Sequence, residues 1–263
     1  MTGINAHQGS VPSPTGMIFD VDGVLVASPH ERAWRDSLTQ LMTEEWRHLT
    51  PSSSYHPEKF TTHVYQQYVA GKPRASGARA VLDHFNIPDA GVRAEEYART
   101  KQALLERLIA NGEFEGFADA LRLVAALHRR GIPMAAASSS KNANTMMAQI
   151  DLANADGAPH GAEPIHLLQV FAANVCGRDV EHGKPSPDLF LLAAEELGVP
   201  PVRCVVVEDA TSGIEAAKAG GMRAIGVARL DDADMLQKAG ADIVVTNLDA
   251  IAVDRLAEGR LEH

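Results

Sequence analysis

Short apolar runs recur along the chain and alternate with longer segments in which apolar residues return every three or four positions. The apolar runs cover 17–19, 132–137, 202–207, 224–227 and 243–245. Short, largely apolar runs of this length are typical of strands buried on both faces, whereas the spaced pattern predicts amphipathic helices. Strands alternating with helices predict an α/β fold with a doubly wound, Rossmann-like parallel sheet.

The alternation is interrupted once, in a long stretch that follows the first strand. This stretch is charged and helical in pattern, has no convincing strand, and contains the loop YVAGKPRASG in its middle. We therefore predict a helical insert at residues 28–112, placed within a core formed by residues 15–27 and 113–263. The polar residues 1–14 are expected to form a flexible N-terminus.

Composition narrows the class of protein. The 263 residues are 45% hydrophobic and carry a formal net charge of −10. The chain can therefore bury a core, and its acidic balance argues against a nucleic-acid binder, which needs a basic face. Cys176 and Cys204 have no metal-type spacing, which favours free thiols in a reducing compartment. Neither a signal-peptide core nor a membrane-length apolar run is visible. We expect a cytoplasmic protein without nucleic-acid or membrane partners.

Polar side chains follow the predicted strands at the points where they end. Asp20 and Asp22 follow the first strand, SSSKN (138–142) follows the second, and the acidic pair 208–209 follows the third. Lys184 lies in the loop GKPSPD before the next helix. Parallel strands end on one edge of their sheet, and ligands bind just outside that edge. We therefore expect these side chains to form one site.

The carboxylates Asp20, Asp22, Glu208 and Asp209 would repel one another at this edge. A like-charge pair at about 4 Å costs roughly 4 kcal/mol at an effective dielectric constant near 20, and Mg²⁺, which prefers oxygen ligands, is the usual remedy. A carboxylate can attack phosphorus, and a cation and a lysine can neutralise the phosphoryl group under attack. Asp20 is the candidate nucleophile, Asp22 the candidate general acid/base, and Lys184 the candidate phosphoryl-binding cation.

These segments resemble a known family. DVDGV (20–24), the strand-end Ser138, GKPSPD around Lys184 and VVVEDATSGIEAA (205–217) resemble, in this order, the four motifs of the haloacid dehalogenase superfamily of phosphotransferases. The resemblance implies that the helical insert is a cap that closes over the site. It also implies that Ser138 and Lys184 hold the transferring phosphoryl group, and that the Asp22 backbone carbonyl joins the metal ligands.

Within this superfamily the chain resembles the beta-phosphoglucomutase-like subfamily. SSSKN in the core, and HERAW, AGKPR and ARTKQ in the insert, are similar to segments that contact substrate in that subfamily. Two departures, Ala70 in place of a lysine and Gly77 in place of a serine, bear on the choice of sugar. The substrate-binding residues implied by this resemblance are His30, Gly71, Arg74, Lys101, Ser140, Lys141 and Asn142.

The resemblance implies a monomeric, Mg²⁺-dependent phosphomutase that interconverts beta-D-glucose 1-phosphate and D-glucose 6-phosphate. The reaction would pass through an aspartyl-phosphate and a sugar 1,6-bisphosphate, which would also serve as primer. One alternative is a phosphatase of the same superfamily acting on sugar phosphates or other small phosphoesters. Another is a non-catalytic binder of a phosphorylated ligand, which the retained pair Asp20 and Asp22 disfavours because a binder needs no nucleophile.

Overall fold

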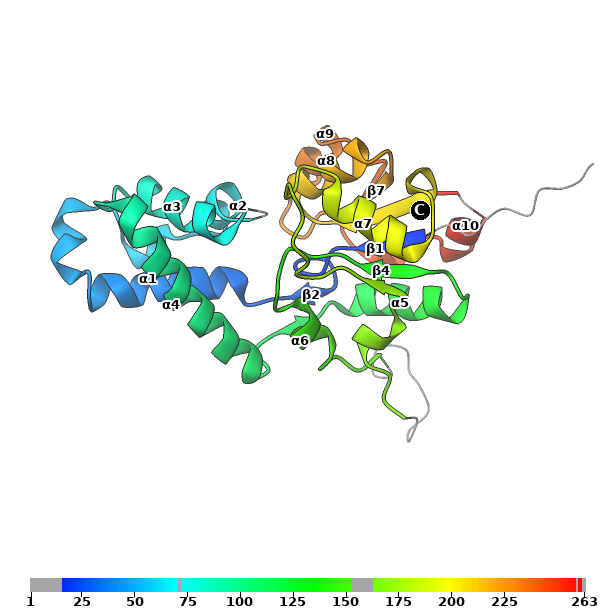
Figure 1. Cartoon of the computed structure of the whole chain (residues 1–263), viewed down its shortest axis with the longest axis horizontal. Coiled ribbons are helices and arrows are strands. Elements are labelled where there is room, and N and C mark those ends of the chain that lie inside the picture. Colours follow the sequence, from blue (N-terminus) through cyan, green and yellow to red (C-terminus); the bar gives the residue numbers. More distant parts are fainter. Residues whose placement is uncertain (1–15, 71, 153–162, 259, 262–263) are drawn as a thin grey trace, which may run out of the picture.

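The computed structural model describes residues 16–70, 72–152, 163–258 and 260–261. Its centre is a six-stranded sheet in the order β5-β4-β1-β6-β7-β8, with every neighbouring pair parallel (Figure 1). The strands are β1 (Gly16–Phe19), β4 (Met134–Ala136), β5 (Ala173–Asn174), β6 (Cys204–Glu208), β7 (Arg223–Val227) and β8 (Ile243–Val245). The predicted flexible segment 1–14 lies outside the described residues.

Helices cover both faces of this sheet, because alternate strand residues point to opposite sides. Met17 and Phe19 of β1 pack in a hydrophobic cluster with α5, α6 and α10, whereas Ile18 packs in a second cluster with α7, α8 and α9. The doubly wound α/β fold predicted from the sequence is confirmed. The helices are α5 (Ala118–Arg129), α6 (Ala143–Met147), α7 (Asp188–Leu197), α8 (Thr211–Ala219), α9 (Ala233–Lys238) and α10 (Val253–Ala257).

Strand register brings the predicted site together. Phe19, the last residue of β1, pairs with Ala136 of β4 on one side and with Val207 of β6 on the other. The residues that follow these three positions therefore leave the sheet at the same edge. They include Asp20 and Glu208.

A second, helical part of the chain lies beside the core, to its left in Figure 1. Its own core includes Trp34 and Tyr97, whose rings meet edge to face at 5.0 Å between centroids. Its elements are α1 (His30–Thr43), η1 (Arg47–Ser52), η2 (Pro57–Lys59), α2 (Thr62–Tyr68), α3 (Arg74–His84) and α4 (Ala90–Ala110). We call this part the cap and keep 28–112 as its proposed extent.

Two short strands join the cap to the core. β2 (Val26–Ala27) and β3 (Glu115–Gly116) pair antiparallel, so the chain enters and leaves the cap through adjacent segments. The pattern of apolar residues does not predict this pair, nor the two-residue strand β5, because their pairing depends on neighbours far away in the chain. The cap therefore has its own hydrophobic core and is joined to the rest of the chain by two adjacent linkers.

Some predicted boundaries differ from the structure. The strand expected over 132–137 is shorter, since β4 covers Met134–Ala136. The sequence SPDLFLLAAEELG (186–198) predicts a helix with Ser186 as N-cap and Pro187 in its first turn. The helix begins instead at Asp188, and Ser186 donates its hydroxyl to the Asp188 carboxylate at 2.5 Å. Cys176 and Cys204 are free, as predicted. Within the described residues, no helix is both long and apolar enough to cross a membrane.

Candidate active site

The turn after β1 carries Asp20 and Asp22 toward the end of β6. The Asp20 amide donates to the Val207 carbonyl at 3.0 Å, which extends the sheet pairing to the first aspartate. Gly23 then adopts φ +90°, and a Cβ atom there would lie 1.9 Å from an Asp209 carboxylate oxygen. Only glycine fits this close approach, so Gly23 allows the two acidic loops to meet.

Lys184 lies between two buried carboxylates. Its Nζ donates to Asp20 Oδ1 at 2.6 Å and to Glu208 Oε1 at 2.5 Å, and the three side chains are 7%, 8% and 1% exposed. The other Glu208 oxygen accepts from the Ala210 amide at 2.8 Å. Burial alone disfavours the ammonium form, but Asp20 and Glu208 together raise the pKa of Lys184. Lys184 therefore stays charged at neutral pH and fixes the position of Asp20.

The carboxylates at this edge crowd one another. Burial raises the pKa of Asp20 to about 7, with Glu208 and Asp22 adding to the shift and Lys184 opposing it. Burial, together with Glu208 and Asp20, raises the pKa of Asp209 well above its usual value. One lysine therefore does not neutralise the buried negative charge. A second cation would lower the free energy of this cluster.

The oxygen donors present fit Mg²⁺. In the described part of the chain, no three His, Cys, Asp or Glu side chains are already grouped to hold a metal ion. Mg²⁺ does not need such a cage, since it usually binds one or two carboxylates and completes its shell with water and substrate phosphate. The predicted ligands Asp20, Glu208, Asp209 and the Asp22 carbonyl would supply hard oxygen donors of this kind, although Lys184 engages an oxygen of both Asp20 and Glu208.

Asp22 is held between the core and the cap. One carboxylate oxygen accepts from the Ser138 hydroxyl at 3.1 Å, and Ser138 in turn accepts from the Ser140 amide at 3.0 Å. The other oxygen, Oδ1, is buried and has no hydrogen-bond partner among the described residues, and His30 Nε2 lies 3.5 Å from it. The far ring nitrogen of His30 lies 3.1 Å from Lys101 Nζ. Asp22 thus lines the cavity with one buried carboxylate oxygen that lacks a hydrogen-bond partner among the described residues.

The cap contributes basic side chains to the same space. Burial lowers the pKa of His30 to about 4, with Lys101 and Arg74 adding to the shift and Asp22 opposing it. Burial and Arg74 lower the pKa of Lys101 to about 7, and Lys101 also lies 5.1 Å over the Trp34 ring. Lys101 and Arg74, whose positive charges disfavour each other, form a site prepared for an anion.

Core and cap side chains line one cavity of about 640 Å³. Every predicted site residue in the described part of the chain lines it, whereas Gly71 lies outside the described residues. The core residues in its wall are Asp20, Asp22, Ser138, Ser140, Lys141, Asn142, Lys184, Glu208 and Asp209, and those from the cap include His30, Arg74 and Lys101. Segments far apart in the sequence thus meet around a space suited to a small ligand.

Sequence reasoning missed several residues of this wall. Tyr65, on α2, lies in the cavity, and burial together with the carboxylates Asp22 and Asp209 raises its pKa. Phe117 and Arg229 also line the cavity. None of the three lies in a recognisable motif, and only the nearness of Tyr65 to the AGKPR loop could have drawn attention to it.

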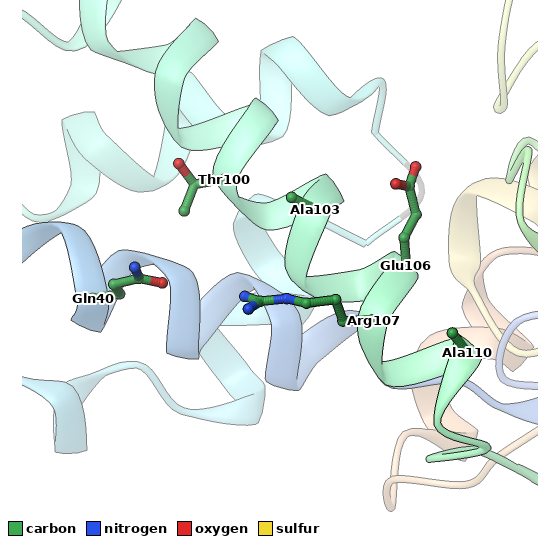
Figure 2. A pocket seen from close by; sticks show the side chains of 6 residues that line it. All are labelled: Gln40, Thr100, Ala103, Glu106, Arg107 and Ala110. Carbon is green, nitrogen blue, oxygen red and sulfur yellow. The ribbon is translucent and has the colours of Figure 1, made fainter.

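A second hollow, of about 680 Å³, lies on the cap between α1 and α4 (Figure 2). Its walls carry Glu106 and Arg107 and include none of the side chains that follow the core strands. We therefore assign the chemistry to the first cavity.

Lys101 is expected to take up a proton when an anion binds in the cavity. At pH 8 its amine is largely neutral, since its pKa of about 7 lies below that pH. An anion bound near Lys101, His30 and Arg74 raises that pKa, so binding takes up a proton. Sulfate, which does not titrate near pH 8, is a suitable probe in calorimetry with two buffers of different ionisation enthalpy. We expect buffer-dependent heat that Lys101→Met removes; equal heats for the wild type in both buffers would refute this.

Comparisons with known proteins agree with this geometry. A family model for haloacid dehalogenase-like hydrolases matches residues 14–221. The chain is 32% identical to a beta-phosphoglucomutase of Mycobacterium tuberculosis, over 88% of each chain. It is 31% identical to the fructose-1-phosphate phosphatase YqaB of Escherichia coli, over 81% of this chain and 95% of that one.

A solved structure shows the same architecture. The beta-phosphoglucomutase of Pyrococcus sp. strain ST 04 superposes with a TM-score of 0.68 at 29% identity, covering 93% of this chain and 97% of that one. The family model spans most of the chain, and relatives above 30% identity include both a mutase and a phosphatase. The protein is therefore an enzyme of one of these two kinds. It belongs to the haloacid dehalogenase-like hydrolase family, in the beta-phosphoglucomutase-like subfamily.

Proposed function

We propose that the protein is a Mg²⁺-dependent phosphomutase that interconverts beta-D-glucose 1-phosphate and D-glucose 6-phosphate through an aspartyl-phosphate and a sugar 1,6-bisphosphate. The observation that carries this proposal is the presence of cap cations in the same cavity as the Asp20–Lys184 pair. A mutase must hold one phosphate at the nucleophile and a second phosphate at the far end of the sugar. Arg74 is suited to the second, because a guanidinium binds phosphate bidentately.

The first half-reaction transfers a phosphoryl group from the bisphosphate to Asp20. A carboxylate oxygen of Asp20 forms the new bond to phosphorus while the bond to the sugar oxygen breaks and leaves its electron pair on that oxygen. Asp22, protonated at this stage, gives its proton to the leaving oxygen. Lys184 and the Ser138 hydroxyl hold the phosphoryl oxygens, and bound Mg²⁺ would supply further positive charge there.

The second half-reaction transfers the group to the other end of a sugar monophosphate. Asp22, now a carboxylate, takes the proton from the attacking sugar hydroxyl, whose oxygen bonds to phosphorus as the bond to Asp20 breaks. Ser140, Lys141, Asn142 and Arg74 would hold the phosphate that is not being transferred. Lys141 is exposed and ends 3.6 Å from Asp179, so it can turn toward a ligand at little cost.

A phosphatase is the second candidate. It uses the same Asp20 chemistry with water in place of the sugar hydroxyl, and the 31% identical YqaB protein is named as a phosphatase of fructose 1-phosphate. The departures at Ala70 and Gly77 bear on the same question, because they change the neighbourhood of the proposed far-phosphate site. A small phosphorylated sugar is the proposed partner in either case. The monomeric state and the cytoplasmic location stay predictions.

Arg74 distinguishes the two candidates. If Arg74 holds the far phosphate, Arg74→Ala is expected to slow glucose 6-phosphate formation by on the order of 10²-fold, since it removes a charge-assisted bidentate contact. Hydrolysis of p-nitrophenyl phosphate, which has no second phosphate, should change little. Arg79→Ala is the matched control, because Arg79 lies on the same helix and pairs at 3.6 Å with the exposed Asp83. If Arg74→Ala slowed the reactions of both substrates by the same factor, Arg74 would not be the residue that holds the far phosphate.

A further inference from the structure

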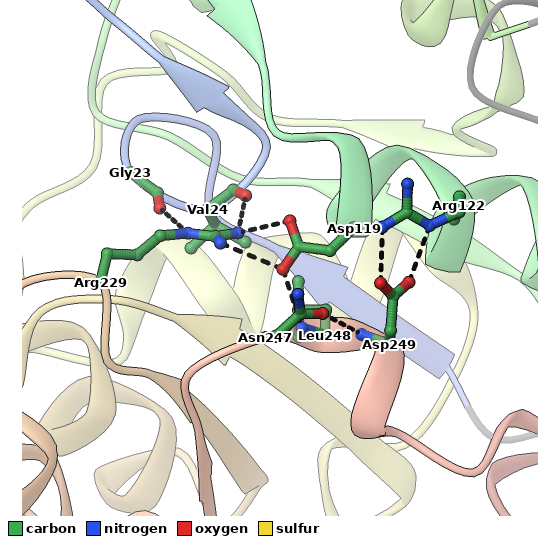
Figure 3. Close-up of polar contacts among 8 residues, drawn as sticks. All are labelled: Gly23, Val24, Asp119, Arg122, Arg229, Asn247, Leu248 and Asp249. Atoms are coloured by element: carbon green, nitrogen blue, oxygen red, sulfur yellow. Dashed lines mark hydrogen bonds and ion pairs between the residues drawn. The ribbon is translucent and has the colours of Figure 1, made fainter.

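Arg229 binds the turn that carries the general acid/base. Its Nε donates to the Gly23 carbonyl at 3.3 Å, and its Nη2 donates to the Val24 carbonyl at 3.2 Å (Figure 3). These two residues follow directly after Asp22. The side chain of Arg229 is 15% exposed, and the residue lines the active-site cavity. Its contacts therefore constrain the backbone on the C-terminal side of Asp22.

A buried carboxylate fixes Arg229 from the opposite side. Asp119, on α5, accepts from Arg229 Nη1 at 3.0 Å and from Nη2 at 3.2 Å. The side chain of Asp119 is 6% exposed, and one of its oxygens also accepts from the Leu248 amide at 2.8 Å. Although burial opposes ionisation, the hydrogen bonds from Arg229 and Leu248 lower the pKa of Asp119 below its usual value. Asp119 is thus a charged, immobile anchor for the guanidinium.

The second cap linker touches the same guanidinium. The Arg229 guanidinium carbon lies 3.8 Å from the centroid of the Phe117 ring, directly after β3. The Phe117 amide donates to the Leu25 carbonyl at 3.0 Å, which joins this linker to the turn after Asp22. Arg229 therefore contacts residues just before the first cap linker and just after the second.

We propose that Arg229 is a positioning residue that sets the place of Asp22 for proton transfer by holding the backbone of residues 23 and 24. This inference rests on the proposed function, in which Asp22 protonates the leaving sugar oxygen. The turn needs an external support because Gly23, with φ +90°, is intrinsically free to take other conformations. Arginine is required, since a lysine ammonium lacks the planar fork that reaches two carbonyls and a carboxylate while stacking on Phe117.

The rate of phosphoenzyme formation lost in Arg229→Lys is expected to depend on the leaving group of the phosphoryl donor. A sugar oxygen needs a proton as its bond to phosphorus breaks, whereas p-nitrophenolate leaves without one. With enzyme in excess, phosphoenzyme formation from glucose 1,6-bisphosphate is expected to slow about 10-fold or more in Arg229→Lys, a part of the 10²- to 10⁴-fold that acid–base catalysis typically contributes. Formation from p-nitrophenyl phosphate should slow less than about 2-fold, because it does not use that proton.

Arg122 provides the matched control. It lies on α5 beside Asp119 and makes its own two-point contact with Asp249, at 2.8 and 2.5 Å, away from the turn (Figure 3). Arg122→Lys should leave the ratio of the two rates unchanged. Asp119→Asn, which keeps the shape of the anchor and removes its charge, should change the ratio in the same direction as Arg229→Lys. Both rates come from one preparation, so their ratio does not depend on the folded fraction.

Phosphoenzyme formation by the wild type tests the proposed function, and the ratio of the two rates in the variants tests the positioning role of Arg229. If the wild-type enzyme forms no phosphoenzyme from either donor, the proposed function fails and the inference fails with it. If the wild type reacts but Arg229→Lys slows both donors equally, or slows neither, the positioning role alone is overturned. A ratio change of the same size in Arg122→Lys would overturn it as well, because that variant leaves the turn untouched.

Discussion

Replacing Asp20 with asparagine is expected to reduce turnover by on the order of 10⁴-fold or more, because the amide cannot accept the phosphoryl group. The fold should persist. The amide oxygen can still accept from Lys184, and one of the crowded carboxylates is gone. The measurement is kcat with the best sugar phosphate, together with the midpoint of thermal unfolding.

Asp234→Asn, on the exposed face of α9, is the control for this substitution. It should leave both kcat and the unfolding midpoint unchanged. Turnover that persists in Asp20→Asn at a tenth of the wild-type rate or more would show that Asp20 is not the nucleophile.

Replacing Lys184 with methionine is expected to lower both activity and stability. The substitution leaves Asp20 and Glu208 buried without their shared cation, and breaking a buried pair in this way typically costs about 3–5 kcal/mol. Urea unfolding in the presence of a chelator measures the free energy of unfolding without help from a divalent cation. Added Mg²⁺ should recover part of the loss, because it supplies positive charge to the same carboxylates.

Lys218→Met is the matched control for Lys184→Met. Lys218 also makes a short contact with a carboxylate, 2.7 Å to Asp242, but both side chains are 35% exposed. An exposed pair is worth about 0–1 kcal/mol. An equal decrease in the free energy of unfolding in Lys184→Met and Lys218→Met would mean that burial of Lys184 between two acids has no special effect on stability.

The sequence predicted which core side chains gather at this edge because the information was local. Each of Asp20, Ser138 and Glu208 ends or follows an uninterrupted apolar run, and parallel strands must end at a common edge. The observed register, with Phe19 between Ala136 and Val207, brings these ends together. An apolar run followed by acids or serines therefore sufficed to predict which side chains lie together at that edge of the sheet.

The missed features depend on contacts between distant segments. The pairing of β2 with β3 forms only because both cap linkers leave the core at one place, and their four residues carry no distinct pattern. Arg229 follows β7 without a motif, and its partners Asp119 and Phe117 lie more than a hundred positions earlier. Positions of this kind become visible only when the whole chain is folded.

The most direct test of the proposed function follows two products at once. Purified enzyme is given Mg²⁺, beta-D-glucose 1-phosphate and a trace of glucose 1,6-bisphosphate, and glucose 6-phosphate and free phosphate are measured in parallel. A mutase produces glucose 6-phosphate without a matching amount of free phosphate, and this is the result we predict. Free phosphate as the main product would contradict the mutase assignment, make the enzyme a phosphatase, and leave Arg74 without its proposed role.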